Sequence, residues 1–471
     1  MPDDGPIHPS FPRRAAALPI AIIGAGPVGL AAAAELLARG LRPLVLEAGA
    51  EIGASVRAWG HVRMFSPWRY NIDEAARTLL EAAGWAAPDP EAYPTGTELV
   101  DSYLAPLAAM PAMASSIRTG ARVVGITRAG HDRMRDGARA EAPFVLQIAD
   151  PAGDVTEVEA GGVIDCSGTW TSPNPAGAHG LPAPGERTAQ DRIAYGIPAV
   201  LGTARATYAG LTTLVVGGGH SAMNAVLDLA TLAAQAPGTG IAWAFRRPRA
   251  EVNFGGGAAD GLAERGALGA RAQALADAGT VRILAPFLIA RITRGEGRLT
   301  VTAQDGQAVT VDRIIVAAGF RPDFGFLGEL RTEFDAAVQS PPALAPLIDP
   351  NIHSCGTVRP HGEAELRHPE PGFWVAGMKS YGRAPTFLLA TGHEQVRSIA
   401  AALAGDWVAA RRVELVLPET GVCLAAPAAA FCAPETPQGV CCAPKPELPA
   451  AAACCGPAPT KVTVKAGSCC G

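Results

Sequence analysis

A pattern of strand, glycine-rich turn, helix and second strand occurs twice in this chain. The first copy has an apolar strand from Leu18, a turn at residues 24–29 (GAGPVG), a helix and a strand at 44–46. The second copy repeats this order around residues 217–222 (GGGHSA) and ends in a strand at 241–245. The apolar spacing in each copy is typical of a βαβ unit. A repeat of this length predicts two related α/β domains rather than a solenoid.

Three glycines of the first turn have the spacing G-x-G-x-x-G. Gly24 permits a tight turn, Gly26 lets the backbone approach a pyrophosphate, and Gly29 lets the helix pack close to the strand. The helix N-terminus adds free N–H groups and the positive end of the helix dipole. Because the motif follows a strand, opens a helix and precedes an acidic strand end, it predicts a Rossmann-like dinucleotide-binding domain. The alternative is a strand–turn–helix with a structural role alone.

The charge at the end of each second strand predicts which dinucleotide binds. Glu47 ends this strand in the first copy, where a carboxylate accepts hydrogen bonds from ribose hydroxyls and repels a 2′-phosphate, so that FAD or NAD fits. Arg246 and Arg247 end it in the second copy, and guanidinium groups pair well with a 2′-phosphate. The sequence therefore favours FAD in the first domain and NADPH in the second, with NADH or a solvated arginine loop as alternatives. The residues expected around the NADPH pyrophosphate are Gly217, Gly219, His220 and Ser221, with Ala222 in the place of the third glycine.

The two domains divide the chain unevenly. We expect an FAD-binding domain in two parts, residues 15–195 and 346–415, interrupted by an NADPH-binding domain at residues 196–345. Residues 416–471 are rich in Ala, Pro and paired Cys and contain few large apolar side chains. Such a segment buries too little surface to offset its ordering entropy, so a disordered, Cys-rich C-terminal tail is expected.

Charge and hydropathy argue against several kinds of partner. The 471 residues carry a formal net charge of -5, which disfavours nucleic acid or an anionic membrane as the main partner. Hydrophobic residues make up 48% of the chain, but polar residues interrupt every run before the roughly 18 residues of a membrane span. The apolar run after residue 14 leads into the glycine turn without a small-residue cleavage site. We expect a cytoplasmic protein.

Residues 15–415 resemble the two-dinucleotide-binding-domain flavoproteins, particularly flavin-containing monooxygenase-like proteins. The resemblance rests on the two glycine turns, on the pairs 167–168 (SG) and 318–319 (AG), which resemble Ala-Thr-Gly segments of the family, and on residues 319–323 (GFRPD). Three segments look like a bacterial flavoprotein group often associated with arsenic-resistance operons: 165–170 (DCSGTW), 217–222 (GGGHSA) and 377–385 (GMKSYGRAP).

This resemblance implies which residues hold FAD. Gly24, Gly26, Gly29 and Glu47 would hold the adenosine end. The flavin side would be lined by Arg57 and Trp59, and a stretch from residue 377 to 391 would close over the pyrophosphate and isoalloxazine through Gly377, Met378, Lys379, Tyr381 and Thr386. Related reductases carry a Gly-Asp pair at this last site, whereas Met378 follows Gly377 here, so that backbone groups or Lys379 would have to replace the aspartate.

Two departures from the family bear on the chemistry. Flavin monooxygenases carry a linker of the form F-x-G-x-x-x-H, and the best match, residues 200–206 (VLGTARA), lacks both the Phe and the His. Oxygenation is therefore not assured by the motif. Disulfide reductases of the superfamily place a redox cysteine pair beside the flavin, yet residues 31–59 contain no cysteine and the NADPH domain contains no C-x-x-C. We expect neither usual kind of disulfide-reductase chemistry.

Eight of the ten cysteines follow Pro418, and six of these form three adjacent pairs. Adjacent cysteines make a strained disulfide, whereas soft thiolates bind soft ions such as trivalent arsenic or antimony, Hg(II), Cu(I) and Zn(II). The alternative is a low-complexity tail with incidental thiols. Cys355, flanked by His353 and His361, forms a second soft-ligand cluster, or else a satisfied turn. The expected metal or metalloid ligands are therefore Cys441, Cys442, Cys454, Cys455, Cys469, Cys470 and Cys355.

These expectations converge on an NADPH-dependent FAD oxidoreductase of flavin monooxygenase type that acts in arsenic detoxification on a trivalent arsenical. Hydride would pass from nicotinamide to flavin, and the reduced flavin would activate molecular oxygen. Ser66 and Asn71 are the candidate catalytic residues, or else ordinary loop residues. The alternatives are an NADPH-dependent metal-ion or metalloid reductase and a non-enzymatic, thiol-based metalloid-sequestering flavoprotein. Whether the chain is a monomer or a homodimer stays open.

Overall fold

The computed structural model describes residues 17–248, 254, 260–352, 358–385 and 387–415. A parallel five-stranded sheet, in the order β16-β7-β1-β2-β3, forms the centre of a first lobe. Four of its strands are buried along their whole length, as expected for a parallel sheet covered on both faces. The strands are β1 (Ile20–Ile23), β2 (Pro43–Leu46), β3 (Ile117–Arg118), β7 (Gly162–Asp165) and β16 (Phe373–Val375).

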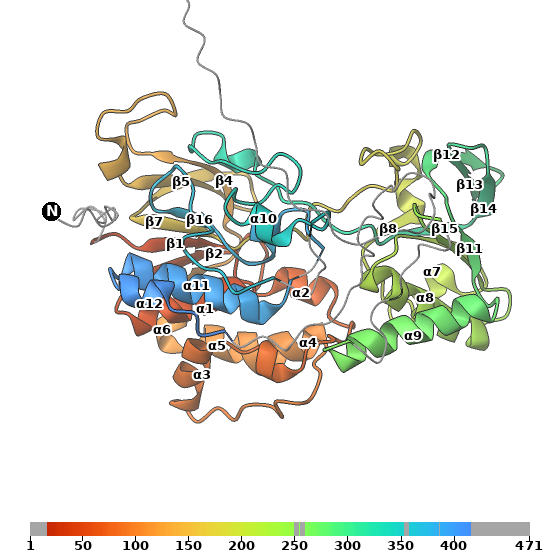
Figure 1. The fold of residues 1–471 in the computed structure, drawn as a ribbon, viewed down its shortest axis with the longest axis horizontal. Coiled ribbons are helices and arrows are strands. Elements are labelled where there is room, and N and C mark those ends of the chain that lie inside the picture. The colour runs from red at the N-terminus through yellow and green to blue at the C-terminus, as the bar shows by residue number, and fades with distance from the viewer. Residues whose placement is uncertain (1–16, 249–253, 255–259, 353–357, 386, 416–471) are drawn as a thin grey trace, which may run out of the picture. The chain divides into compact units, whose positions relative to one another are not determined.

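Helices cover one face of this sheet and a small antiparallel sheet covers the other (Figure 1). The helices are α1 (Pro27–Ala38) and α11 (Leu389–Leu403), and the small sheet contains β4 (Arg122–Arg128), β5 (Phe144–Ala149) and β6 (Val155–Ala160). Neighbouring side chains of β1 point to opposite faces, so Ile22 joins the core with the helices and Ile23 joins the core with β5.

The end of the described chain returns to the first lobe. β16 pairs in parallel with β7, and the Ala376 N–H donates to the carbonyl oxygen of Asp165 at 2.9 Å. α11 then packs against α1. The first sheet therefore contains strands from both ends of the described chain, with the second lobe inserted between them.

The second lobe repeats the same layers. Its parallel sheet has the order β11-β10-β9-β15-β8, with α8 and α9 packed on one face and an antiparallel sheet of β12, β13 and β14 on the other. The strands and helices of this lobe are β8 (Ile193–Tyr195), β9 (Thr212–Val216), α8 (His220–Gln235), β10 (Gly240–Ala244), α9 (Ala263–Asp277), β11 (Arg282–Leu284), β12 (Ile289–Gly295), β13 (Arg298–Ala303), β14 (Ala308–Val311) and β15 (Arg313–Val316).

The remaining helices are short, and polar side chains cap several of them. Asp73 accepts a hydrogen bond from the Ala76 N–H at 2.9 Å at the start of α3 (Glu74–Glu81), and Thr95 and Glu98 form a capping box on α4 (Gly96–Leu99). The others are α2 (Ala54–Ala58), a π-helical segment (Val100–Leu104), α5 (Ala105–Ala109), α6 (Pro111–Ala114), α7 (Arg205–Tyr208), α10 (Ala345–Ile348), α12 (Trp407–Arg411) and 3₁₀ segments at Trp68–Tyr70, Arg139–Glu141, Arg187–Arg192, Gly325–Leu327 and Gly377–Tyr381.

The predicted α/β fold class with two Rossmann-like domains, the first interrupted by the second, is confirmed. The predicted tail at residues 416–471 lies outside the described residues. Among the described residues, no helix is long and apolar enough to cross a membrane.

Candidate functional site

The two glycine turns have the same backbone geometry. Gly24 and Gly217 both adopt a left-handed φ, +98° and +129°. A Cβ atom on Gly24 would lie 2.9 Å from the carbonyl oxygen of Cys166, and one on Gly217 would lie 2.3 Å from that of Ala317. Cys166 and Ala317 directly follow β7 and β15, which are the strands paired with β1 and β9. The same tight turn is therefore built twice, and the conformation and the close approach both require glycine.

Gly26 and Gly219 open the helices that follow these turns. Each is the N-cap, of α1 and of α8, each has extended backbone, and neither helix start is capped by a side chain. A Cβ atom on either glycine would meet no atom of the chain within 4 Å. Free N–H groups at a helix start beside open space are what a pyrophosphate requires, so both turns fit a dinucleotide.

Gly29 has a different role from Gly26. A Cβ atom on Gly29 would lie 1.9 Å from the carbonyl oxygen of Gly24, so this glycine lets α1 pack directly on the turn. In the second lobe the buried Ala222 stands at the equivalent position of α8. The spacing of small residues therefore reflects both ligand access and helix packing, as the sequence indicates.

Glu47 follows β2 and holds the first turn in place. Its two carboxylate oxygens accept hydrogen bonds from the backbone N–H groups of Ala25 and Gly49, each at 2.7 Å. Glu47 is half-buried, and each oxygen keeps a second lone pair for a ribose hydroxyl. The geometry is compatible with the predicted contact to ribose, and it adds a role in shaping the turn that the sequence did not reveal.

Arg246 and Arg247 follow β10 and are exposed. β10 stands beside β9 as β2 stands beside β1, so Phe245 is at the position equivalent to Glu47 and the two arginines follow directly after it. The Trp243 indole N–H donates to the Gly217 carbonyl oxygen at 2.7 Å and ties this strand to the second turn. Two exposed guanidinium groups beside the turn suit a phosphorylated ribose.

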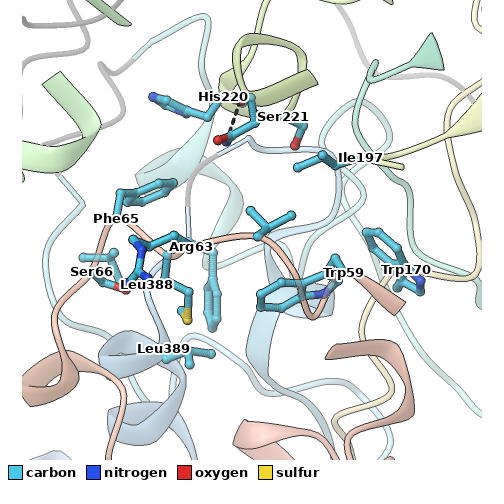
Figure 2. A pocket seen from close by; sticks show the side chains of 14 residues that line it. Trp59, Arg63, Phe65, Ser66, Trp170, Ile197, His220, Ser221, Leu388 and Leu389 are labelled. Atoms are coloured by element: carbon cyan, nitrogen blue, oxygen red, sulfur yellow. Dashed lines mark hydrogen bonds between the residues drawn. The ribbon is translucent and has the colours of Figure 1, made fainter. Parts of the chain in front are cut away.

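A cavity of about 270 Å³ is lined by residues of both lobes (Figure 2). Its wall is largely apolar, with a few polar side chains, which is the usual character of a site for flat organic rings. The ring of Phe65 meets the imidazole of His220 with 5.2 Å between their centroids. The lining residues are Trp59, Val62, Arg63, Met64, Phe65 and Ser66, then Trp170, Ile197, His220, Ser221 and Asn224, and finally Phe387, Leu388 and Leu389.

His220 and Ser221 reach this cavity because they form the first turn of α8. Burial lowers the pKa of His220, and the charge of Arg265 lowers it further, while Asp260 opposes the shift. The imidazole is therefore neutral at pH 7. The Asn224 side-chain amide donates to the His220 carbonyl oxygen at 3.1 Å, an interaction drawn in Figure 2.

The two candidate catalytic residues form one hydrogen-bonded turn. The Ser66 hydroxyl donates to Asn71 Oδ1 at 2.9 Å, and Asn71 Nδ2 donates to the carbonyl oxygens of Ser66 and Pro67 at 2.8 and 3.1 Å. Ser66 lines the cavity, whereas Asn71 is fully buried and does not. The amide of Asn71 is thus occupied in holding the loop that presents Phe65 and Ser66.

The two residues expected on the flavin side are separated. Trp59 lines the cavity and lies against Gly96, where a Cβ atom would meet the indole at 2.8 Å. Arg57 turns elsewhere and forms ion pairs with Asp101 at 2.7 Å and Glu51 at 3.3 Å. The structure thus places Trp59, but not Arg57, among the cavity residues.

The segment Gly377–Tyr381 is held by a buried polar network. The Gly377 N–H donates to Gln395 Oε1 at 2.7 Å, and the Ser380 hydroxyl donates to the Gly377 carbonyl oxygen at 2.8 Å. Gln395 Nε2 in turn contacts Ser380 Oγ at 2.9 Å and His361 Nε2 at 2.8 Å. Of the other residues expected here, Met378 is half-buried, Lys379 and Tyr381 are buried, and Thr386 lies outside the described residues.

The predicted soft-metal ligands cannot be placed. Cys355 and the six tail cysteines Cys441, Cys442, Cys454, Cys455, Cys469 and Cys470 lie outside the described residues. Within the part of the chain that is described, no three His, Cys, Asp or Glu side chains gather as metal ligands would. His361 is engaged by Gln395 and by the carbonyl oxygen of Arg359, and Cys166 is buried.

Sequence reasoning missed several residues that shape the site. Phe65, Phe387 and Leu388 line the cavity but follow no motif. Asp165 could have been recognised in the sequence, because it directly follows the apolar pair 163–164. A carboxylate at the end of a buried strand needs a cation or a hydrogen-bond donor as partner.

Comparison with known proteins supports this geometry. Residues 19–97 match the family described as FAD dependent oxidoreductase (DAO), and this segment includes the first glycine turn and Glu47. No curated protein matches the sequence significantly.

Three solved structures share the fold at low sequence identity. A bacillithiol disulfide reductase, Bdr (YpdA), from Bacillus cereus is 20% identical with a TM-score of 0.59, over 82% of this chain and 99% of the other. The thioredoxin reductase of T. acidophilum is 14% identical with a TM-score of 0.52, over 83% and 99%. A double mutant of a flavin monooxygenase from Stenotrophomonas maltophilia is 20% identical with a TM-score of 0.51, over 82% and 98%. The chain thus has the two-domain FAD/NAD(P)-binding fold found in reductases and in flavin monooxygenases.

Proposed function

We propose that this protein is an NADPH-dependent FAD oxidoreductase of flavin monooxygenase type that acts on a trivalent arsenical. The observation that carries the redox part is the pair of equivalent glycine turns, one in each lobe, together with a cavity that both lobes line. Opposite charges after β2 and β10, Glu47 against Arg246 and Arg247, support FAD in the first lobe and NADPH in the second.

Bound FAD would accept a hydride from NADPH and pass the electrons to an acceptor. The chain's own part is to bind and orient the two rings and to keep water away from them. Trp59, Phe65 and Leu389 provide apolar walls, while Ser221 and Asn224 offer hydrogen-bonding groups at the start of α8. His220, neutral at pH 7, can donate one hydrogen bond and accept another without adding charge to the cavity.

Two sequence features support the arsenical as substrate. The segments at residues 165–170, 217–222 and 377–385 resemble flavoproteins associated with arsenic-resistance operons, and the tail supplies three adjacent cysteine pairs. Thiolates are the ligands that trivalent arsenic prefers, so the tail would deliver the substrate to the flavin or retain it. Molecular oxygen would be the second substrate.

The test is turnover of the FAD-loaded full-length protein with NADPH in an oxygen electrode, with and without arsenite or a methylated trivalent arsenical. The proposal expects the arsenical to raise NADPH consumption, with an equal rise in oxygen uptake. If the arsenical fails to change either rate, the proposed substrate is wrong.

A metalloid reductase is the second candidate, supported by the fold shared with two reductases. It differs in needing no oxygen, so anaerobic NADPH oxidation driven by the metalloid alone would favour it. If neither turnover is found, and arsenite binding disappears with removal of the chain after Pro418, the protein sequesters the metalloid without enzymatic action.

A further inference from the structure

A buried ion pair lies at the edge of the first sheet where FAD would bind. Lys379 Nζ lies 2.6 Å from Asp165 Oδ2, and the two side chains are only 1% and 0% exposed. Asp165 ends β7, and Lys379 follows β16, the neighbouring strand. The pair therefore joins the carboxyl ends of two adjacent parallel strands.

The Ser167 side chain connects this pair to the surface of the site. Its hydroxyl donates to Asp165 Oδ1 at 2.6 Å and accepts from Lys379 Nζ at 3.0 Å, and its backbone N–H donates to the same carboxylate oxygen at 3.0 Å. Ser167 itself is exposed. It also borders the first glycine turn, because a Cβ atom on Gly24 would lie 3.0 Å from Ser167 Cα.

The ammonium group is held on its other sides by aromatic rings. Lys379 Nζ lies 4.5 Å from the ring centroid of Phe326 and 5.4 Å from that of Phe324. Each ring face attracts a cation, so the two rings are favourable neighbours for this buried ammonium group. Lys379 is thus a fixed positive charge rather than a mobile surface side chain.

Asp165 is less completely satisfied than its partner. Within the described residues, Oδ2 accepts no aligned hydrogen bond, although it is fully buried. The Ser167 donors serve Oδ1, whereas Oδ2 faces the ammonium group of Lys379. Removing the lysine would therefore leave an uncompensated carboxylate beside the turn that faces the cofactor.

We propose that Lys379 is a positioning residue of the FAD site, which neutralises Asp165 and sets the affinity of this edge for the anionic diphosphate of the cofactor. The ammonium acts through Ser167 and the Gly24 turn and does not contact FAD directly. Asp165 and Ser167 engage two of the three donors of this ammonium group, so the proposed role differs from the direct polar contact with FAD that the sequence suggests. The inference rests on the FAD half of the proposed function and is independent of NADPH and of the arsenical.

The experiment measures the dissociation constant of FAD from the apoprotein by flavin fluorescence for wild type, Lys379→Met, Asp165→Asn and the double variant. An electrostatic role predicts opposite signs for the two single variants. Lys379→Met leaves a buried negative charge and is expected to weaken FAD binding at least tenfold. Asp165→Asn leaves a positive charge and is expected to bind FAD at least as tightly as wild type. The double variant, which restores neutrality, should fall between them, and Lys379→Arg should recover most of the affinity.

The control is Arg128→Met, which breaks a comparably buried pair in the same lobe. Arg128 and Glu370 are 3% and 1% exposed and 2.8 Å apart, and Arg128 stacks on Phe144 at 3.6 Å, away from the glycine turn. This variant should unfold at a lower temperature and yet bind FAD within about twofold of wild type.

The results distinguish failure of this inference from failure of the proposed function. If both single variants at the Lys379–Asp165 pair weaken binding alike, the pair has a structural role only and the inference is overturned. If wild-type apoprotein takes up no FAD, the proposed function itself fails. Thermal unfolding of each apoprotein shows whether a variant is folded, and an unfolded Lys379→Met is replaced by Lys379→Gln in the same series.

Discussion

The ring of Phe65 lies 5.2 Å from the imidazole ring of His220, and the two planes are inclined by 46°. Phe65 belongs to the loop after α2, and His220 is the first residue of α8. The contact therefore joins the wall contributed by the first lobe to the helix start at which NADPH is expected to bind. Both residues line the cavity between the lobes.

We expect Phe65→Ala to slow the reduction of bound flavin by NADPH at least tenfold, because the two rings would be less well oriented across a widened cavity. The dissociation constant of FAD should change little, because the substitution leaves the Gly24 turn and Glu47 intact. Stopped-flow absorbance of the flavin checks the rate. Equal rates for variant and wild type would show that the contact does not orient the rings.

Substitutions at two glycines of the first turn should have different effects, one mainly on FAD binding and the other on folding. Gly26→Ala adds a methyl group where no atom of the chain lies within 4 Å, so we expect a loss of about 1 kcal/mol or less in the free energy of unfolding together with weakened FAD binding. Gly29→Ala forces a contact of 1.9 Å and should cost about 3 kcal/mol or prevent folding. Urea unfolding and FAD titration of both variants make the comparison, and a stable Gly29→Ala would be inconsistent with the close packing of α1 on the turn.

Replacing the exposed arginines should change the choice of nicotinamide cofactor. A charge-assisted hydrogen bond to phosphate is worth about 1.5–3 kcal/mol, so Arg246→Ala and Arg247→Ala should each lower kcat/KM for NADPH about tenfold or more. The value for NADH should stay within about twofold, because NADH lacks the 2′-phosphate. Arg271→Ala, at an exposed site on α9, is the control. A parallel loss with both cofactors would assign the arginines to folding or to general electrostatics.

Asp73 should make stability depend on pH. Burial, followed by the charge of Glu35, raises the pKa of Asp73 to about 8. The folded protein keeps the proton on the Asp73 carboxyl group up to about pH 8, whereas the unfolded chain releases it near pH 4. The contribution of Asp73 to stability is therefore fully present below pH 4 and is lost as the pH rises towards 8. The substitution Asp73→Asn keeps an oxygen acceptor for the Ala76 N–H and removes the titrating group. We therefore expect this variant to be about 1–3 kcal/mol more stable than wild type at pH 8 and equal to it near pH 4.

Urea unfolding at several pH values checks this prediction. Glu81→Gln, at an exposed position in the last turn of α3, is the control and should leave the pH profile unchanged. An Asp73→Asn variant with the profile of wild type would show that Asp73 is ionised in the folded protein.

Glu370 should be essential to the first lobe, because it compensates two buried arginines. Its carboxylate lies 2.8 Å from Arg128 and 2.8 Å from Arg139, and it also accepts the Arg331 N–H at 3.0 Å. Glu370→Gln leaves the arginine charges uncompensated and should lower the free energy of unfolding by about 3–5 kcal/mol. Thermal and urea unfolding measure the loss, and a change under about 1 kcal/mol would mean that water reaches these arginines.

The sequence predicted the fold correctly at positions where only one residue type can adopt the required backbone conformation. Gly24 and Gly217 need a left-handed φ beside a crossing strand, so glycine spacing predicts both turns, and the apolar runs predict the strands beside them. The cavity was not predictable in this way. Phe65, Phe387 and Leu388 come together only through the packing of distant segments, and any large apolar side chain would leave the same pattern in sequence.

The contacts of the charged side chains could likewise not be predicted from the sequence. Glu47 was assigned to ribose from its place after a strand, but its hydrogen bonds to Ala25 and Gly49 depend on the folded turn. Lys379 and Asp165 lie far apart in sequence, so their pairing follows only from the neighbouring positions of β7 and β16.

The place of β16 in the first sheet has a consequence for biosynthesis. The second lobe is built from one continuous stretch, but the first sheet stays incomplete until residue 375 has left the ribosome. Because domains emerging from the ribosome tend to fold as units, the inserted lobe should become protease-resistant on the nascent chain before the lobe that precedes it. Until β16 has been synthesised, β7 is an unpaired edge strand of the first sheet. Unpaired strand edges are surfaces that chaperones shield.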